Sequence, residues 1–263
     1  MYPTNVDQLV QQYAAGKRDF VGIQLAGANL SGLDLRGINL TDACLSFATL
    51  DRTVLSGASL QGAFLYGARM QYARLSEADL TQCDLTKADL TGTYLVKGNL
   101  TEAKLSGAVL KAVNLRQATL RGANLCGANL QHINLYAANL GSADLSWANL
   151  SQAKLSGARL TGACLANIKL TGAYVNGVDL SGAELDGVDL SHAKLSGVNL
   201  NQASLTASNF SAAQLKMASL IQANLHAANL SGACLTKADL SEAHLSRCEL
   251  GQADLRSANL SGA

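Results

Sequence analysis

Histidine, cysteine and carboxylate side chains are scattered through this sequence without the spacing that a catalytic or metal site requires. The chain has four histidines and six cysteines, and no two cysteines form a CxxC pair. It contains no paired acids suited to hydrolysis, no Ser/His/Asp set and no glycine loop of the kind that cradles phosphates. Its glycines recur beside small polar residues instead. We therefore predict that the protein is not an enzyme and binds no metal or cofactor, and that its cysteines form no disulfide.

The composition indicates a narrow interior filled by small aliphatic side chains. Hydrophobic residues make up 48% of the 263 residues, but aromatic residues only 5%. The net charge is +1, and residues 1–131 carry 12 Lys/Arg against 10 Asp/Glu. This balance gives no basic footprint, so we expect no direct nucleic acid binding. No signal peptide and no apolar run of membrane-spanning length is found, which favours a cytoplasmic protein with no membrane partner.

A strict period of five residues runs through most of the chain. From Leu25 to Leu260, 45 of 48 positions at this interval are Leu; the exceptions are Met70, Val175 and Phe210. In the register two residues earlier, from Ile23 to Ala263, 34 of 49 positions are Ala and most of the others are small or β-branched. Ser, Thr, Asn, Asp and Gly lie between, and these residues favour turns. Neither a helical nor a strand period explains the pattern, so the chain must turn a corner after each inward pair.

The recurring pattern A(N/D)LSG, as in residues 28–32, resembles the pentapeptide-repeat family and is similar to its cyanobacterial members. The resemblance covers residues 20–263. It implies an all-β solenoid, a right-handed quadrilateral β-helix with four pentapeptides per coil and about 12 coils. Leu would then point to the axis and Ala would fill the space between Leu layers. Because no insertion breaks the register, only the faces and the ends of the rod remain for function.

The two ends are expected to differ. Residues 1–19 do not repeat, and apolar residues at helical spacing predict a short helix over 5–15 that caps the first coil. Docking of this helix to a partner or a membrane surface is the alternative. Beyond Leu260 nothing resembles a cap. An open coil would expose strand edges, so we expect either a homodimer through the C-terminal coil or a chain that is part of a longer one.

A four-repeat coil stacks residues that are 20 apart, which predicts ladders along the rod. Five ion pairs are expected one coil apart: Arg69–Asp89, Glu77–Lys97, Asp84–Lys104, Arg159–Asp179 and Lys169–Asp189. Four cation–tyrosine stacks are expected: Arg52–Tyr72, Arg74–Tyr94, Arg116–Tyr136 and Lys154–Tyr174. Side-chain amides are expected to bond to each other at Asn114–Asn134, Asn129–Asn149 and Asn209–Asn229. We interpret these ladders as structural, with a recognition surface as the alternative.

Bulky aromatic residues gather in the N-terminal third, near several arginines. We predict a candidate contact patch made of Phe47, Phe64, Tyr66, Tyr72, Arg52, Arg69, Arg74 and, further along, Trp147. Exposed aromatic clusters of this kind mark binding sites, although a chance distribution along a solvated rod fits as well.

The sequence favours a structural or protein-interaction rod that binds an unidentified protein partner through a face or an end. The alternative is mimicry of DNA, because some members of the resembled family protect DNA gyrase in this way. A duplex mimic should be strongly acidic, and a net charge of +1 argues against it. Four acids do gather at Asp179, Glu184, Asp186 and Asp189. A designed scaffold, the third possibility, fits poorly with the irregular outward residues.

Overall fold

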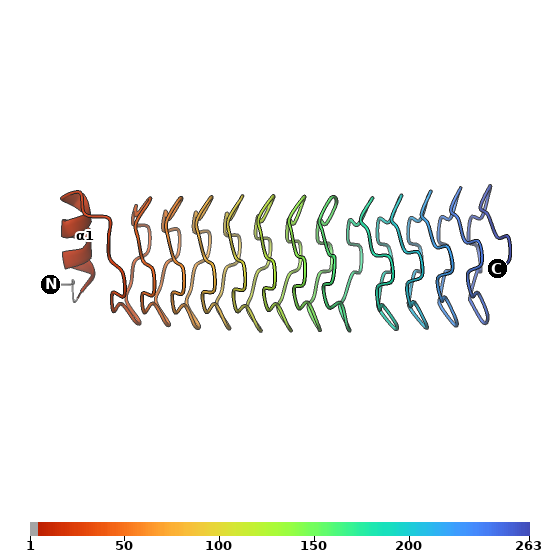
Figure 1. Cartoon of the computed structure of the whole chain (residues 1–263), viewed down its shortest axis with the longest axis horizontal. Helices are drawn as coiled ribbons and strands as arrows, with labels where there is room; N and C mark the ends of the chain where they lie inside the picture. Colours follow the sequence, from red (N-terminus) through yellow and green to blue (C-terminus); the bar gives the residue numbers. More distant parts are fainter. Residues whose placement is uncertain (1–4) are drawn as a thin grey trace.

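The protein is a straight rod of stacked coils with one helix at its N-terminal end. A computed structural model describes residues 5–263 (Figure 1). The helix, α1 (Val6–Ala14), lies across the end of the rod, and the coils follow one another to the opposite end. Within the described residues, no helix is long and apolar enough to cross a membrane.

Every side of a coil is shaped by the same β-turn. The amide of the small inward residue donates to the carbonyl of the preceding Leu, as from Ala123 to Leu120 (3.1 Å). The residue before the small one always has a positive φ; it is Gly in many turns, and Lys87 and Trp147 adopt this conformation as well. Left-handed backbone favours glycine because a Cβ meets the next carbonyl there. The preference for glycine at this position explains why Ser-Gly-Ala recurs in the sequence. The same turn residues return in every repeat because each turn is closed by a hydrogen bond within a few residues.

The coils are held together by a parallel ladder with a spacing of 20 residues. Paired positions run from Asp19–Asn39 to Asp239–Asn259, and each strand is reduced to a single bridged residue. The amide of Leu120 donates to the carbonyl of Asn139 in the following coil at 2.7 Å. The amide of Thr119 donates to the carbonyl of Gly98 in the preceding coil at 3.0 Å. The Leu and Ala side chains between these bonds are buried along the axis. Four pentapeptides therefore form one coil, as the sequence predicts.

The helix α1 packs on the first coil through its apolar side chains. The Asn5 side chain caps it by accepting from the amide of Gln8 (2.9 Å). Leu9 is fully buried, and Val6 and Tyr13 pack against the core. The Tyr13 hydroxyl donates to the carbonyl of Arg36 at 2.8 Å. The predicted helix over 5–15 thus spans Val6–Ala14 and lies against the first coil; residues 1–4 lie outside the described part.

The predicted side-chain ladders were mostly wrong in detail, although the stacking register was right. None of the five expected ion pairs forms within residues 5–263; Arg69 pairs with Asp51 at 2.8 Å instead of Asp89. Of the four cation–tyrosine stacks, only Arg116 over Tyr136 is in contact, at 5.6 Å from the ring centre. The expected amide-to-amide bonds are also absent between the named asparagines of the described coils.

The reason is that a closer partner is available to these polar side chains. Asn129 and Asn149 accept from the backbone amide two residues later, at 3.2 and 3.1 Å. This local bond recurs along the rod and closes a turn within one repeat. The turn bond does not exclude a bond along the axis, because Asp189 accepts both from its own turn at Ser191 (3.0 Å) and from the Asn209 amide of the next coil (3.2 Å).

Aspartates at this position make stability depend on pH. Burial acts to raise the pKa of Asp189, but hydrogen bonds from Thr171 (2.7 Å) and Ser191 outweigh it, and the pKa is lowered. The pKa values of Asp179 and Asp239 are lowered as well, chiefly by the backbone amides of Ser181 and Ser241. As the pH falls, an aspartate in the unfolded chain, with a pKa of about 3.9, is protonated before the same aspartate in the folded protein. The stabilisation is therefore complete above that value and is lost below it.

We expect the urea midpoint to fall between pH 6 and pH 3. In Asp189→Asn the side chain still accepts from Ser191 but does not titrate, so its midpoint should fall by less over the same interval. Urea unfolding of both proteins at the two pH values tests this. An identical loss in both proteins would show that Asp189 contributes nothing to the pH dependence.

Candidate interaction surfaces

The structure divides the candidate contact patch among several faces. Phe64 lies on one face, and Tyr66 lies at the corner that follows it. Phe47 lies at the same corner one coil earlier, with its ring edge-on to Tyr66 at 5.4 Å. Arg69 lies on the next face. The other members are placed as follows: Arg52 and Tyr72 at the following corner, Arg74 on the face beyond it, and Trp147 at the Phe47 corner further along the rod. Two pairs are brought together: Phe47 and Tyr66 by their ring contact, and Arg52 and Tyr72, which line a common hollow.

Two corner rings lie over glycines of the next coil. A Cβ at Gly67 would meet the ring of Phe47 at 2.8 Å, and one at Gly92 would meet the ring of Tyr72 at 2.6 Å. Both glycines also have positive φ. Each therefore serves the turn and makes room for a ring. At Gly107, which shares the turn conformation, a Cβ would meet nothing within 4 Å.

We expect Gly67→Ala to destabilise the protein more than Gly107→Ala. Both variants incur the cost of left-handed backbone, about 1–2 kcal/mol, but only the first displaces the Phe47 ring. Chemical unfolding of the two variants measures the difference. In the double variant Phe47→Ala/Gly67→Ala, the Gly67 substitution should cost no more than Gly107→Ala; a larger cost there would show that the ring is not the cause.

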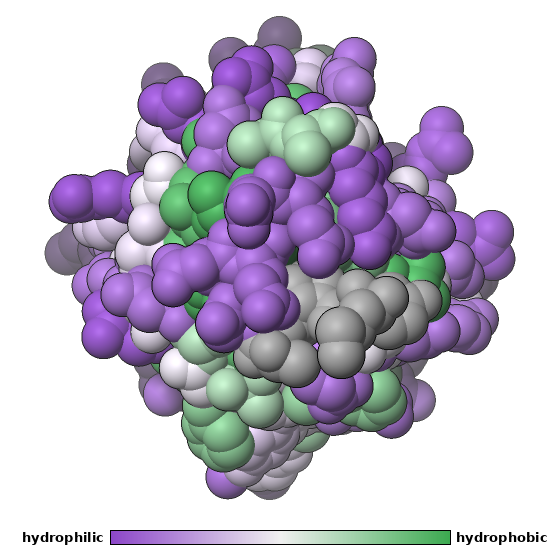
Figure 2. Space-filling model, turned by 90° about the vertical axis from the view of Figure 1, so that its left-hand side faces the viewer, coloured by the Kyte–Doolittle hydropathy of each residue, from purple (hydrophilic) through white to green (hydrophobic). Residues whose placement is uncertain are grey.

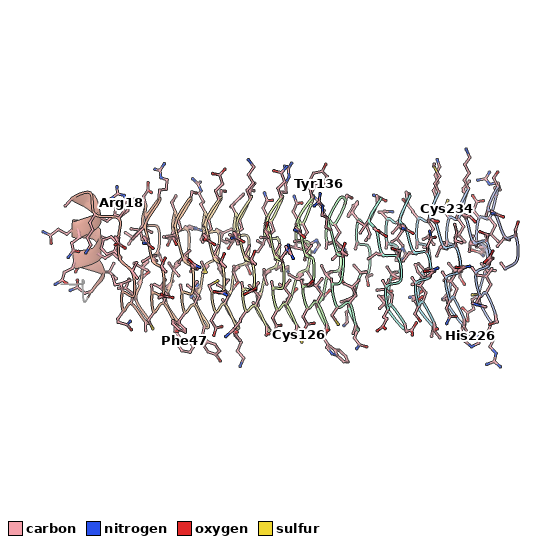
Figure 3. All side chains as sticks on the ribbon, in the orientation of Figure 1. Arg18, Phe47, Cys126, Tyr136, His226 and Cys234 are labelled. Atoms are coloured by element: carbon pink, nitrogen blue, oxygen red, sulfur yellow. The ribbon has the colours of Figure 1, made fainter. Side chains whose placement is uncertain are left out.

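Thiols, imidazoles and acids are kept apart by the coil geometry. In the part of the chain that the structure describes, no three His, Cys, Asp or Glu residues are placed to hold a metal ion. All six cysteines are free. Cys83 is buried in the place of an inward Ala, and burial raises the pKa of its thiol strongly. Cys126 and His226 project from the same side of the rod as Phe47 (Figure 3).

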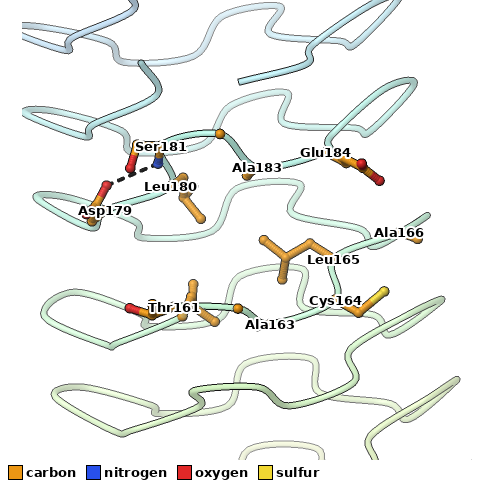
Figure 4. Close-up of a pocket in the computed structure, with 13 residues that line it drawn as sticks. Thr161, Ala163, Cys164, Leu165, Ala166, Asp179, Leu180, Ser181, Ala183 and Glu184 are labelled. Carbon is orange, nitrogen blue, oxygen red and sulfur yellow. Dashed lines mark hydrogen bonds between the residues drawn. The ribbon is translucent and has the colours of Figure 1, made fainter. Parts of the chain in front are cut away.

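Along residues 5–263 the ladder opens at one place, which we call the seam. Neither Arg159–Asp179 nor Cys164–Glu184 is bridged, although Lys154–Tyr174 and Lys169–Asp189 on either side are. The separated segments line a cleft of about 340 Å³, with Leu165 and Leu180 pointing inward (Figure 4). The expected Arg159–Asp179 ion pair falls at this opening and does not form among the described contacts.

The backbone at the seam lacks the partners that it has elsewhere. Across residues 5–263, Leu160 and Leu165 are among the inward Leu residues whose amides donate to no carbonyl of the next coil; their equivalents Leu140 and Leu145 do so at 2.8 and 2.9 Å. Leu160 is 8% exposed, whereas Leu140 is fully buried. The seam is therefore the point of weakest contact between consecutive coils in the middle of the rod.

A basic face is the feature that sequence reasoning missed. It consists of seven stacked segments, 91–97, 111–117, 131–137, 151–157, 171–177, 191–197 and 211–217. These carry six Lys/Arg and no Asp/Glu, whereas the remaining residues between 91 and 217 carry four Lys/Arg and six Asp/Glu. When charges are summed over each half of the chain, all four faces are added together, and the difference between the basic face and the other faces disappears. Counting charges by their position within the 20-residue coil would have found it.

The basic face lies on the opposite side of the rod from Phe47. Tyr136 projects from one edge of the rod and Phe47 from the other (Figure 3). A shallow hollow of about 350 Å³ on this face is lined by Arg116, Tyr136, Lys154 and Tyr174, with Asn134 and Ser156. Figure 2 shows the N-terminal end of the rod, where hydrophilic side chains predominate and apolar residues are confined to limited areas.

Comparisons with known proteins place these surfaces in context. A family model described as pentapeptide repeats matches in overlapping copies that together run from residue 19 to residue 263. The chain is 32% identical to HetL of the cyanobacterium Nostoc sp. strain PCC 7120, over 98% of this chain and 95% of that chain, with a TM-score of 0.29. HetL is described as a pentapeptide repeat protein involved in the regulation of heterocyst differentiation.

Two further solved structures are similar to this chain. Rfr23 of the cyanobacterium Cyanothece 51142 is 26% identical, over 62% of this chain and 98% of that chain, with a TM-score of 0.20. QnrB1, a plasmid-mediated fluoroquinolone resistance protein, is 16% identical, over 73% of this chain and 86% of that chain, with a TM-score of 0.43. No curated protein matches the sequence.

Proposed function

Because the chain belongs to the pentapeptide-repeat family, whose members are right-handed quadrilateral β-helices, we propose that it is a non-enzymatic cytoplasmic rod that binds a protein partner through its outer faces. The family match indicates a repeat protein and no catalytic family. The regulatory role described for HetL is compatible with a protein that acts by binding.

The observation that carries this proposal is the exposure of large aromatic side chains on an otherwise polar rod. Phe47 and Trp147 are 64% and 66% exposed, and Phe64 and Tyr72 are exposed as well. The interior is filled by Leu and Ala, so the rings are not needed for the core. Exposed aromatic rings supply most of the binding energy at the centres of protein interfaces.

The experiment is a pull-down with the purified rod and two matched variants. One variant changes Phe47, Tyr66 and Trp147 to Ser, and the other changes Tyr94, Tyr136 and Tyr174 to Ser. We expect at least one protein to bind the wild type and to be lost from one variant but not the other. Proteins that bind all three rods equally, or none, would contradict a partner held by aromatic side chains.

Modulation of a topoisomerase by DNA mimicry is the second candidate. The observation in its favour is that the faces away from the basic face have an excess of acids between residues 91 and 217 (six Asp/Glu against four Lys/Arg). A supercoiling assay with DNA gyrase tests it directly. Inhibition or protection of gyrase by the rod would support mimicry, whereas unchanged supercoiling at a large excess of rod would exclude it.

A further inference from the structure

Cations and tyrosines occur in each of eight consecutive coils on and next to the basic face. We call this set the tyrosine–cation stripe; its members in order along the rod are Arg74, Tyr94, Arg116, Tyr136, Lys154, Tyr174, Lys194 and Lys216. The ladder places Arg74 beside Tyr94 and Tyr174 between Lys154 and Lys194. From Arg74 to Lys194 the cations of the stripe recur at about every second coil, roughly 9.6 Å apart, with tyrosines in the coils between them, whereas Lys194 and Lys216 lie in consecutive coils. Lys97 and Lys111 add positive charge at the corners of the same face.

The stripe is accessible, and no salt bridge of the described chain occupies its cations. Tyr136 and Tyr174 are 47% and 44% exposed, and both line the hollow on the basic face. The three salt bridges of residues 5–263 involve Arg36, Arg69 and Arg256, none of which belongs to the stripe. Segments 91–97 to 211–217 contain no carboxylate, and Glu77 is the acid in the segment of Arg74.

We propose that the stripe binds an acidic α-helix of a protein partner, laid along the rod. This inference rests on the proposed function and names the face and the chemistry of the partner. Carboxylates of the helix would pair with Arg116, Lys154 and Lys194, and apolar side chains would contact the tyrosines between them. Tyr and Arg are enriched in protein interfaces, and complementary charge fixes the register of a partner.

The spacing favours a helix over an extended strand. Seven residues of an α-helix rise about 10.5 Å, close to the two-coil interval of roughly 9.6 Å. The side chains on one face of a strand recur at about 6.6 and 13.2 Å, and neither value matches. Long Lys and Arg side chains absorb the remaining difference of about 1 Å per repeat. The backbone groups of this face already pair with neighbouring coils, so no strand edge is free there.

A nucleic acid fits the stripe less well. Duplex DNA carries a phosphate every 3.4 Å or so on each strand, far denser than the cations of the stripe. The net charge of +1 provides no strong attraction for a polyelectrolyte, and the other faces carry the acids.

The test uses a synthetic helical peptide with Glu at every seventh position and Leu midway between, and a scrambled peptide of equal composition. Binding is measured by fluorescence anisotropy to the wild-type rod, to Lys154→Glu/Lys194→Glu, and to Lys104→Glu/Lys169→Glu. The two double variants have the same net charge, but the second changes other faces. Thermal unfolding of each variant verifies that it is folded.

We expect the patterned peptide to bind the wild type, and the stripe variant to bind it about tenfold or more weakly. The control variant should bind within about twofold of the wild type, and the scrambled peptide should bind weakly to all. Tyr136→Ser/Tyr174→Ser should also weaken binding of the patterned peptide.

Several outcomes would overturn the proposal. These are no binding of the patterned peptide, equal loss in both charge-reversed variants, or tighter stripe-dependent binding of a single-stranded oligonucleotide. The pull-down described above separates this failure from that of the proposed function. If a partner is lost only from the Phe47/Tyr66/Trp147 variant, the protein is still an interaction rod, but its binding site lies on a face other than the stripe.

Discussion

The amide of Leu160 should exchange its hydrogen about a hundredfold or more faster than the amides of Leu140 and Leu180. The three residues are of one type and occupy the same position in successive coils. Leu140 and Leu180 donate to the next coil at 2.8 and 2.7 Å, whereas Leu160 donates to no backbone carbonyl. Protected amides exchange only through opening of the structure, and a hundredfold difference corresponds to about 3 kcal/mol of opening free energy.

Hydrogen exchange followed by NMR at the three amides measures this difference. The amide of Leu165, compared with that of Leu145, provides a second test on the neighbouring face. The bridged pair Lys154–Tyr174 supplies an internal control within the same two coils, because the Leu155 amide donates to Tyr174 at 2.8 Å and should be protected. Protection of Leu160 equal to that of Leu140 would show that the coils close at the seam in solution.

The second large effect is expected when a Leu is shortened in the middle of the stack. Leu120 is buried between Leu layers of the neighbouring coils. The substitution Leu120→Ala leaves a cavity that the close-packed coils on either side cannot fill. We expect a loss of about 2–5 kcal/mol in the free energy of unfolding. Urea unfolding followed by circular dichroism is the measurement.

Leu260→Ala is the matched control because it is the same substitution at the same position of the repeat. Leu260 is 42% exposed in the last coil, and its truncation removes less buried surface. The expected loss is below about 1 kcal/mol, following the smaller area withdrawn from water. Equal losses in the two variants would mean that burial along the axis does not determine the stability of the rod.

The seam and the core predictions are linked by the one-dimensional architecture. Each coil contacts only its neighbours, so the stability of the rod is a sum of coil and interface contributions. The interface between the coils of Leu160 and Leu180 is weakened. It therefore changes how strongly unfolding of the N-terminal coils is linked to unfolding of the C-terminal coils, and not the stability of either part by itself. Leu120 lies well inside the N-terminal part, and the cost of its truncation should not depend on the seam.

The sequence by itself determined the repeat, the turns and the core. A Leu at every fifth position and a small residue two places earlier settle which side chains are buried, because each turn is closed by bonds inside one repeat. The hydrogen bonds that Asn129 and Asn149 accept from the backbone amides two residues later are also local. The prediction that these two side chains bond to each other along the rod was wrong. The helix at Val6–Ala14 was also readable, because its cap and its apolar spacing are local signals.

Only the tertiary structure decided how neighbouring coils meet. The choice of Asp51 over Asp89 by Arg69, the rings of Phe47 and Tyr72 over glycines of the next coil, and the open seam all depend on contacts between residues 18 to 20 apart. Such contacts are set by side-chain rotamers and by small changes in coil spacing, which a five-residue pattern does not encode. The basic face combines both sources: the period stacks its residues, and their exposure and freedom from ion pairing come from the three-dimensional arrangement.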